Sequence, residues 1–248
     1  MATPEPPLSR IDDTPDLRPS NGSIRQQLQI LALQGTVLPA AADATYAAPT
    51  NDIRRNPDTF TLLKTSEVEY GDQFTIVSKP PDVTLDELRV ATTDNPPDEL
   101  LLELPDNVAG VVSDLATQVT AGATTDADKL LALQHWLRSE FTYDLTASAS
   151  DDAIEVFLQT RSGFCEQFAS TFAVMARTLG IPSRVAVGFT PGELAADGSY
   201  RVTGSNAHAW PEIWFDGIGW IPFEPTPQHG IPGAEHYTGI EADQQPAA

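Results

Sequence analysis

Hydrophobic residues between Pro105 and Gly180 recur at steps of three and four, which is the period of amphipathic helices. Asp106 and either Thr125 or Asp126 are suitable N-caps for the first two helices. Gly180, followed closely by a proline, ends the last helix. The pattern predicts helices over 108–119, 125–141, 154–158 and 164–179.

Beyond this block the period changes, and short apolar runs bounded by turn residues indicate strands. The predicted strands cover 184–189, 200–203, 208–215 and 220–224, with a hairpin turn at 216–219 between the last two. The same pattern of short apolar runs precedes the helices, where strands are predicted at 24–30, 59–63 and 73–78. Turn signals such as Gly71-Asp72 separate them. The chain is therefore expected to have an α+β fold.

Length and composition fit this organisation, since 248 residues of which 41% are hydrophobic can bury the core of one large domain or two small ones. We expect a disordered linker over 1–22, because prolines are frequent there. A β-rich domain over 23–104 follows, then a mixed core over 105–228. The end of the chain, 229–248, is expected to form a flexible tail.

The chain is strongly acidic, with a formal net charge of −21. Repulsion from phosphate argues against a nucleic-acid partner. Solubility is the simplest explanation of the acidity, and adaptation to high salt or a preference for cationic partners are alternatives. The sequence contains no apolar run long enough to span a membrane, and its start lacks the basic and apolar stretches of a signal peptide.

Cys165 is the single cysteine, so an internal disulfide is excluded. It lies in the first turn of a predicted helix, with Ser162 or Gly163 in reach of the N-cap, where the positive end of the helix dipole favours thiolate over thiol. His208 follows in an aromatic strand, and Glu224 comes after it. A thiol, an imidazole and a carboxylate in this order suggest a nucleophile with an oriented base. The plainer alternative is a buried structural cysteine and an ordinary strand histidine.

Four segments carry a more specific combination of residues. They are 161–169, 179–185, 206–214 and 219–226. In their order and spacing they resemble the transglutaminase-like superfamily of papain-type thiol enzymes, and most nearly its bacterial and archaeal, membrane-associated TgpA-like members. The resemblance covers 105–228 firmly and 23–104 more loosely. It implies a papain-like catalytic core, in which the nucleophile helix packs on an antiparallel sheet, preceded by a smaller β-rich domain.

The chain departs from the family at three positions. Phe164 and Gln167 stand where the family usually has tyrosine and histidine, and both substitutions suit an apolar helix start. Glu224 stands where the triad acid is usually aspartate. Asp216 and Glu212 are alternative acids, although the first lies in the predicted turn and the second lies along the strand from His208. Family members commonly carry transmembrane helices, so the resemblance implies an extracytoplasmic segment that is tethered to a membrane in the full-length protein.

The resemblance also implies chemistry. Cys165 would attack a peptide or protein amide to form a thioester, and His208, oriented by Glu224, would protonate the departing amine. The backbone N–H of Cys165 is a natural oxyanion donor at a helix start, and Tyr143 or Trp136 is a candidate second donor or groove residue. No cofactor is expected. No metal site is expected either, because the two histidines in the predicted tail, His229 and His236, lack ligand spacing.

Two other functions are consistent with the same residues. A cysteine peptidase or amidase would employ the same triad with water as acceptor, because groove shape selects the acceptor. A non-catalytic cell-surface binding module is the second alternative, although such a module needs neither Cys165 nor His208.

Overall fold

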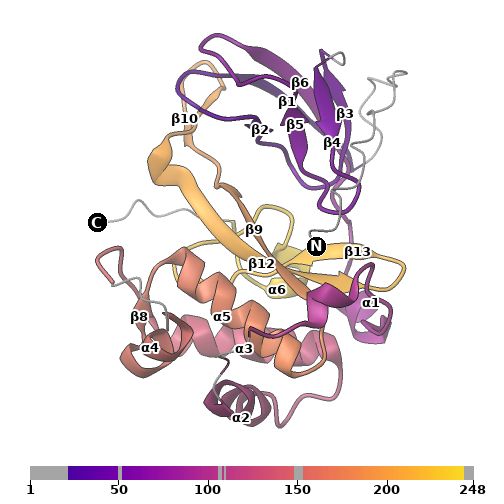
Figure 1. Cartoon of the computed structure of the whole chain (residues 1–248), viewed down its shortest axis with the longest axis vertical. Helices are drawn as coiled ribbons and strands as arrows, with labels where there is room; N and C mark the ends of the chain where they lie inside the picture. The colour runs from indigo at the N-terminus through magenta and orange to yellow at the C-terminus, as the bar shows by residue number, and fades with distance from the viewer. Residues whose placement is uncertain (1–21, 50–51, 106–107, 109, 148–152, 243–248) are drawn as a thin grey trace, which may run out of the picture. The chain divides into compact units, whose positions relative to one another are not determined.

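The computed structural model describes residues 22–49, 52–105, 108, 110–147 and 153–242. The chain divides into two compact units, Met1–Asp82 and Val83–Ala248 (Figure 1). The predicted linker over 1–22 lies almost wholly outside the described residues.

The described part of the first unit consists of strands in two antiparallel three-stranded sheets, with orders β1-β6-β3 and β2-β5-β4. Every second side chain of β6 is buried, as the alternation of its sequence predicts. Apolar residues from both sheets share one core, among them Ile53, Leu62 and Ile76. The predicted β-rich region is confirmed. The strands are β1 (Ile24–Gln29), β2 (Val37–Leu38), β3 (Ala44–Ala48), β4 (Ile53–Arg55), β5 (Leu62–Lys64) and β6 (Gln73–Ser78).

The second unit combines helices with an antiparallel sheet of order β13-β12-β9. Its helices are α1 (Leu85–Val90), α2 (Gly110–Val119), α3 (Asp126–Glu140), α4 (Ala153–Thr160), α5 (Cys165–Thr178) and α6 (Glu235–Thr238), with short 3-10 turns at Glu99–Leu102 and Gly204–Asn206. Its strands are β7 (Thr142–Tyr143), β8 (Ser162–Gly163), β9 (Ser183–Phe189), β10 (Glu193–Leu194), β11 (Tyr200–Arg201), β12 (Ala207–Phe215) and β13 (Gly219–Pro222). The helices and strands predicted here are confirmed to within a few residues.

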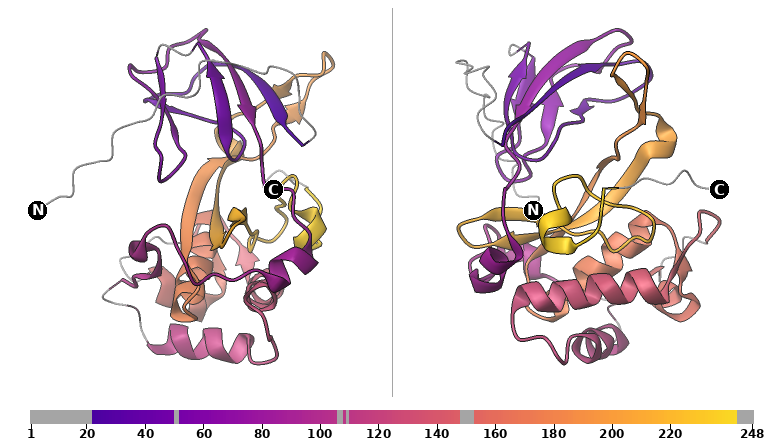
Figure 2. Two further views of the ribbon diagram at one scale, coloured as in Figure 1. Left: turned by 90° about the vertical axis from the view of Figure 1, so that its right-hand side faces the viewer. Right: turned by 180° about the vertical axis from the view of Figure 1, so that it is seen from behind.

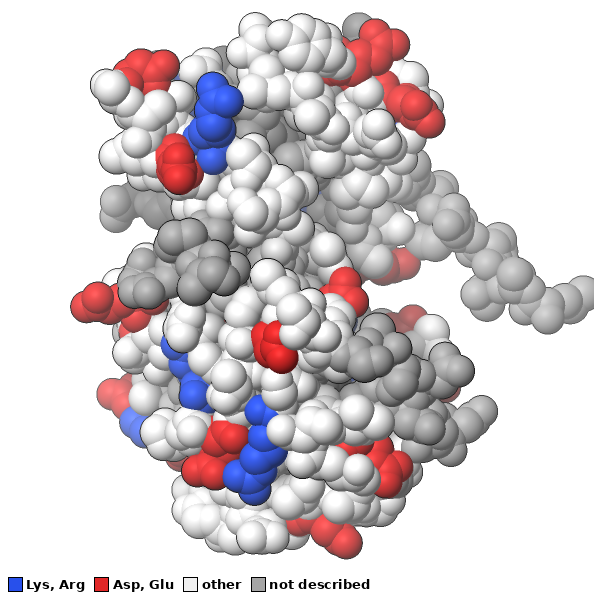
Figure 3. Space-filling view, turned by 90° about the vertical axis from the view of Figure 1, so that its left-hand side faces the viewer, with Lys and Arg blue, Asp and Glu red and all other residues white. Residues whose placement is uncertain are grey.

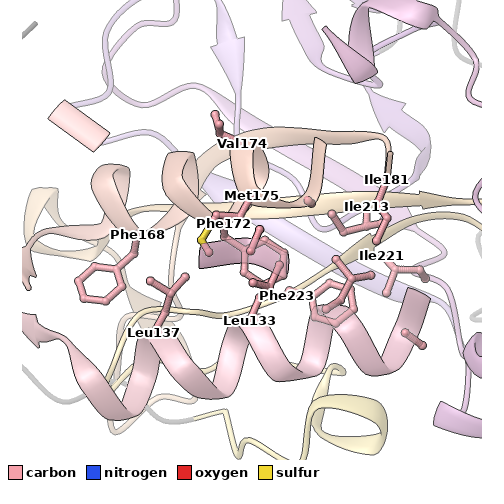
Figure 4. Packing of buried hydrophobic residues seen from close by; sticks show 14 of the residues in the cluster. Leu133, Leu137, Phe168, Phe172, Val174, Met175, Ile181, Ile213, Ile221 and Phe223 are labelled. Atoms are coloured by element: carbon pink, nitrogen blue, oxygen red, sulfur yellow. The ribbon is translucent and has the colours of Figure 1, made fainter. Parts of the chain in front are cut away.

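Helix α5 lies between the sheet and the pair α2 and α3 (Figures 1 and 2). Phe168 and Phe172 of this helix are fully buried, and Phe172 stacks on Phe223 at a ring distance of 5.7 Å. Leu133 and Leu137 of α3 belong to the same cluster and lie between α3 and α5 (Figure 4). A helix that is apolar around most of its circumference is stable only when it is enclosed in this way. The predicted arrangement, a nucleophile helix packed on an antiparallel sheet, is confirmed.

Two predicted boundaries differ from the structure. The compact units divide after Asp82, whereas the sequence placed the division between 104 and 105. The reason is α1, whose Leu88 is buried in the core of the second unit. The predicted tail also contains ordered structure up to residue 242. Tyr237 of α6 is buried in that core and donates a hydrogen bond of 2.8 Å to the carbonyl of Pro222.

Acidic side chains are scattered over the face that Figure 3 shows. On the face shown in Figure 3, Asp and Glu side chains occur at many separate places, and several Lys and Arg side chains lie beside them. Ion pairs such as Arg161–Glu140 at 2.7 Å account for part of this mixture. Within the described residues, every helix is too short or too polar to cross a bilayer.

Candidate active site

The start of α5 presents Cys165 as its first residue, with the side chain half-buried. The predicted cap is not the one observed, because Phe164 occupies the N-cap and Ser162 instead donates to Asp144 at 3.3 Å. Gln167 supplies the missing polar contact by accepting a hydrogen bond of 3.1 Å from the Phe164 N–H. Gln167 is buried, whereas Glu166 next to it is exposed. The helix start is thus closed by a side chain from inside the helix.

The approach to this helix is too tight for any residue larger than glycine at position 163. A Cβ atom on Gly163 would lie 2.4 Å from Gln167 Oε1 and 2.7 Å from the ring of Phe157. The short strand β8 that contains Gly163 pairs in parallel with β7, which contains Tyr143. This pairing fixes the chain immediately before the thiol.

His208 enters the site from β12 and is only 3% exposed. Its neighbour across the sheet is Gly188 of β9, where a Cβ atom would lie 2.8 Å from the ring of Trp210. Trp210 therefore has room to lie against the imidazole, at a ring distance of 6.1 Å and an interplanar angle of 24°. The aromatic strand predicted around His208 is confirmed, and it shields the imidazole from water.

Glu224 follows β13 and completes a line of contacts. Its Oε2 lies 2.7 Å from Nε2 of His208, and both side chains are buried. Its Oε1 accepts a hydrogen bond of 2.9 Å from the Thr226 N–H, and its backbone N–H donates to Gln134 at 2.9 Å. A carboxylate that is held at both oxygens has one orientation available, so it can fix the orientation of the imidazole.

The two alternative acids have other partners. Glu212 pairs with Arg184 at 2.7 Å. Asp216 accepts hydrogen bonds from the side chains of Thr92 and Asn95 at 2.7 and 2.9 Å. Only Glu224, of the three carboxylates considered from the sequence, lies against His208 in the described structure.

The electrostatic state of His208 follows from its neighbours. Burial lowers its pKa, but the Cys165 thiol and the Glu224 carboxylate outweigh burial and raise the pKa to about 9. The Nδ1 atom has no hydrogen bond of standard geometry within the described residues, and it is the ring nitrogen that Glu224 leaves available. At neutral pH the imidazole is therefore protonated. Its Nε2 is hydrogen-bonded to the Glu224 carboxylate, and its Nδ1 is available to interact with the Cys165 thiol.

The candidate oxyanion groups are not equally placed. As the first residue of α5, Cys165 has a backbone N–H that no carbonyl of its own helix can accept. Tyr143 is half-buried, and burial, followed by the electrostatic influence of Cys165 and Glu224, raises the pKa of its phenol. Its ring lies 5.1 Å from that of His229. Trp136 is partly buried at the edge of the core and packs edge-on against Phe141 at a ring distance of 4.9 Å. The structure therefore brings Tyr143, and not Trp136, beside the rings of the site.

Two residues of the site were missed by the sequence reasoning. His229, assigned to the tail, stacks on His208 with a ring distance of 4.5 Å and an interplanar angle of 7°. Arg138 of α3 donates from Nη1 to the backbone carbonyls of Glu224 at 3.0 Å and His229 at 2.9 Å, and also to that of Thr226. Pro225 and Pro227 flank Thr226 and restrict the backbone that follows Glu224. They are the one sequence signal that this segment has a defined conformation.

Among the described residues, no three His, Cys, Asp or Glu side chains gather in a way that could hold a metal ion. The groups at this site are instead a thiol, an imidazole and a carboxylate in sequence. Such an arrangement can perform nucleophilic attack coupled to proton transfer.

The part of the chain that contains this site is similar to known proteins. A model of the transglutaminase-like superfamily matches residues 113–225, a range that includes Cys165, His208 and Glu224. The periplasmic domain of TgpA from Pseudomonas aeruginosa has a TM-score of 0.67 at 28% identity, covering 82% of this chain and 69% of that one.

Two curated relatives are similar over shorter stretches. Uncharacterized protein YebA of Bacillus subtilis is 34% identical over 176 residues, which is 64% of this chain and 24% of that protein. The protein-glutamine gamma-glutamyltransferase of Pseudomonas aeruginosa is 40% identical over 99 residues, which is 39% of this chain and 15% of that protein. The chain thus spans a quarter or less of the length of these two relatives.

Proposed function

We propose that this chain, whose residues 113–225 match the transglutaminase-like superfamily, catalyses thiol-dependent acyl transfer on peptide or protein amides. The observation that supports this most directly is the buried contact of 2.7 Å between His208 and Glu224, with Cys165 at the other side of the imidazole. The supporting relative is a glutamyltransferase, so the amide of a glutamine side chain is the proposed acyl donor.

In the first step the Cys165 thiolate attacks the amide carbonyl carbon and forms a carbon–sulfur bond. The backbone N–H of Cys165 donates to the developing oxyanion, and Tyr143 is the proposed second donor. His208 then gives its proton to the departing nitrogen as the carbon–nitrogen bond breaks, which leaves a thioester and free ammonia. The pKa of about 9 makes His208 a proton donor at neutral pH.

In the second step an acceptor resolves the thioester. A primary amine attacks the thioester carbon, neutral His208 takes a proton from it, and Cys165 leaves as thiolate. Glu224 holds the same imidazole orientation throughout, because its two oxygens have fixed partners. If water replaces the amine, the same residues give an amidase or peptidase.

The acceptor is tested by incubating the full chain with a glutamine-containing protein, with and without a labelled primary amine. Mass spectrometry is expected to show the amine incorporated with loss of ammonia, and Cys165→Ala is expected to abolish the product. Deamidation or backbone cleavage that depends on Cys165 and ignores the amine would support the peptidase or amidase instead. No Cys165-dependent product on any substrate would leave the non-catalytic binding module as the better description.

We also propose an extracytoplasmic location with a membrane tether in the full-length protein. The support is the solved TgpA domain, which is periplasmic. Cell fractionation combined with protease accessibility of intact cells tests the proposal. In cells whose outer membrane or wall has been removed, a protein that resists added protease until the plasma membrane is broken would contradict the proposal.

A further inference from the structure

We propose that His229 is a positioning residue of this site, whose flat ring holds the His208 imidazole in the orientation that serves both Cys165 and Glu224. The inference rests on the proposed function for its catalytic meaning, although its structural part can be measured without any substrate.

The first support is the stacking geometry. The rings of His229 and His208 lie 4.5 Å apart and are inclined by only 7°. Trp210 covers His208 at 6.1 Å with an inclination of 24°. An imidazole with a flat ring on its face cannot turn about its Cβ–Cγ bond without colliding. Such a turn would remove Nε2 from Glu224, so the stacking protects the contact of 2.7 Å.

The second support is the way in which His229 is held. Its backbone carbonyl accepts a hydrogen bond of 2.9 Å from Arg138, which also binds the carbonyl of Glu224 at 3.0 Å. Its Nδ1 lies 3.0 Å from the carbonyl of Pro227, and its ring lies 5.1 Å from that of Tyr143. One guanidinium therefore anchors the backbone of the acid and the backbone of the stacking residue to α3.

The third support is charge. The charged or titratable groups around His229 are His208 on β12, Arg138 on α3, Tyr143 on β7 and the neighbouring Glu224. Burial and the two cationic groups lower the pKa of His229 against the opposing effects of the Pro227 carbonyl and Glu224. His229 is thus neutral under conditions in which His208 is protonated. A neutral ring face attracts the imidazolium, whereas a second cation there would repel it.

The test compares two substitutions in the full chain, His229→Phe and His229→Leu. Both are neutral, both lose the contact with Pro227, and both fill a similar volume, but only phenylalanine keeps a flat ring. The first readout is the rate at which iodoacetamide alkylates Cys165. His229→Phe is expected to retain the wild-type rate, and His229→Leu is expected to lose about tenfold, since a reacting group displaced by a fraction of an ångström is costly.

The second readout is the side-chain nitrogen resonances of His208 in an NMR titration. The wild type and His229→Phe are expected to titrate near pH 9, whereas His229→Leu is expected to titrate at lower pH because Glu224 and Cys165 no longer hold the ring. His236→Ala, which changes an exposed histidine of the same segment, is the control and is expected to match the wild type.

Equal behaviour of the two variants overturns the inference, whether both match the wild type or both fall, because the flat ring would then make no difference. Failure of the proposed function gives a different result. In that case the wild-type thiol is alkylated no faster than in the unfolded chain, while the titration still reports whether His229 positions His208.

Discussion

At the residue scale, the candidate site contains one carboxylate, that of Glu224, whose orientation is fixed by its partners. Glu224 is 1% exposed, and each of its oxygens has a partner. Gln134 accepts a hydrogen bond from the backbone N–H of Glu224 and Arg138 donates one to its carbonyl, so the backbone is held on either side of the side chain. The longer acid is therefore compatible with contact to His208.

Substitutions of Glu224 distinguish the effect of its negative charge from the effect of its side-chain length. Glu224→Gln is expected to reduce the rate of amide turnover, by less than the roughly 10⁴-fold seen when the acid of a serine protease triad becomes an amide. The loss is smaller because a thiolate and an imidazolium attract each other without the acid. Glu224→Asp is expected to retain most of the rate. Turnover measured against Glu212→Gln as a control checks this, and an unchanged rate in Glu224→Gln would place the acid elsewhere.

The raised pKa of His208 makes the stability of the folded chain depend on pH. Since the folded pKa is about 9 and the unfolded value about 6.5, the folded state binds the proton more tightly. The resulting stabilisation is fully present below about pH 6.5 and is lost as pH rises through about 9. Unfolding of the wild type and of His208→Gln, followed by circular dichroism from pH 6 to pH 10, is expected to show the difference shrinking over this interval. A difference independent of pH would contradict the assignment.

At the element scale, Cys165 is presented by the close approach of β8 to α5. Gly163 allows Gln167 to reach back to the N-cap and allows Phe157 to pack beneath it. The strand pairing with β7 then brings Tyr143 alongside. The start of α5 is positioned by this packing rather than by a capping serine.

A methyl group at position 163 tests this packing. Gly163→Ala is expected to destabilise the fold by about 1–3 kcal/mol, as overpacking commonly does, and to slow alkylation of Cys165. Gly122→Ala is the matched control, because a Cβ atom at Gly122 meets nothing within 4 Å. Chemical denaturation gives the free energy of unfolding for both. Equal stability of the two variants would show that the helix start relaxes without cost.

At the scale of the whole molecule, the second unit contains every group of the candidate site. Its core draws on Leu88 of α1 before the predicted boundary and on Tyr237 of α6 after it. The ring of His229 also lies beyond residue 228. The unit that contains the candidate site is therefore larger than the 105–228 segment that the sequence indicated.

Two fragments test the extent of that unit. Residues 83–248 are expected to fold and to alkylate at Cys165 as the full chain does. Residues 105–228 are expected to be much less stable, because large buried side chains such as Leu88 and Tyr237 each contribute roughly 2–5 kcal/mol. Thermal unfolding and labelling of both fragments check this. A stable and reactive 105–228 fragment would restore the shorter boundary, and an inert 83–248 fragment would show that the first unit is needed.

The sequence by itself determined the local structure and the identity of the chemical groups. Helical and strand periods, with glycine and proline at the ends, specified α3, α5, β9 and β12 to within a few residues, because such patterns depend on near neighbours. The spacing of Cys165, His208 and Glu224, read through a family resemblance, also pointed to residues that the structure brings together.

Only the tertiary structure decided the surroundings of these groups. Stacking of His229 on His208, and the hydrogen bonds that Arg138 donates to a segment far along the chain, join residues that no local period connects. The N-cap, the unit boundary and the order of the C-terminal segment likewise depended on which side chains the core encloses. Long-range burial has no fixed sequence spacing, and for this reason it could not be read from the chain alone.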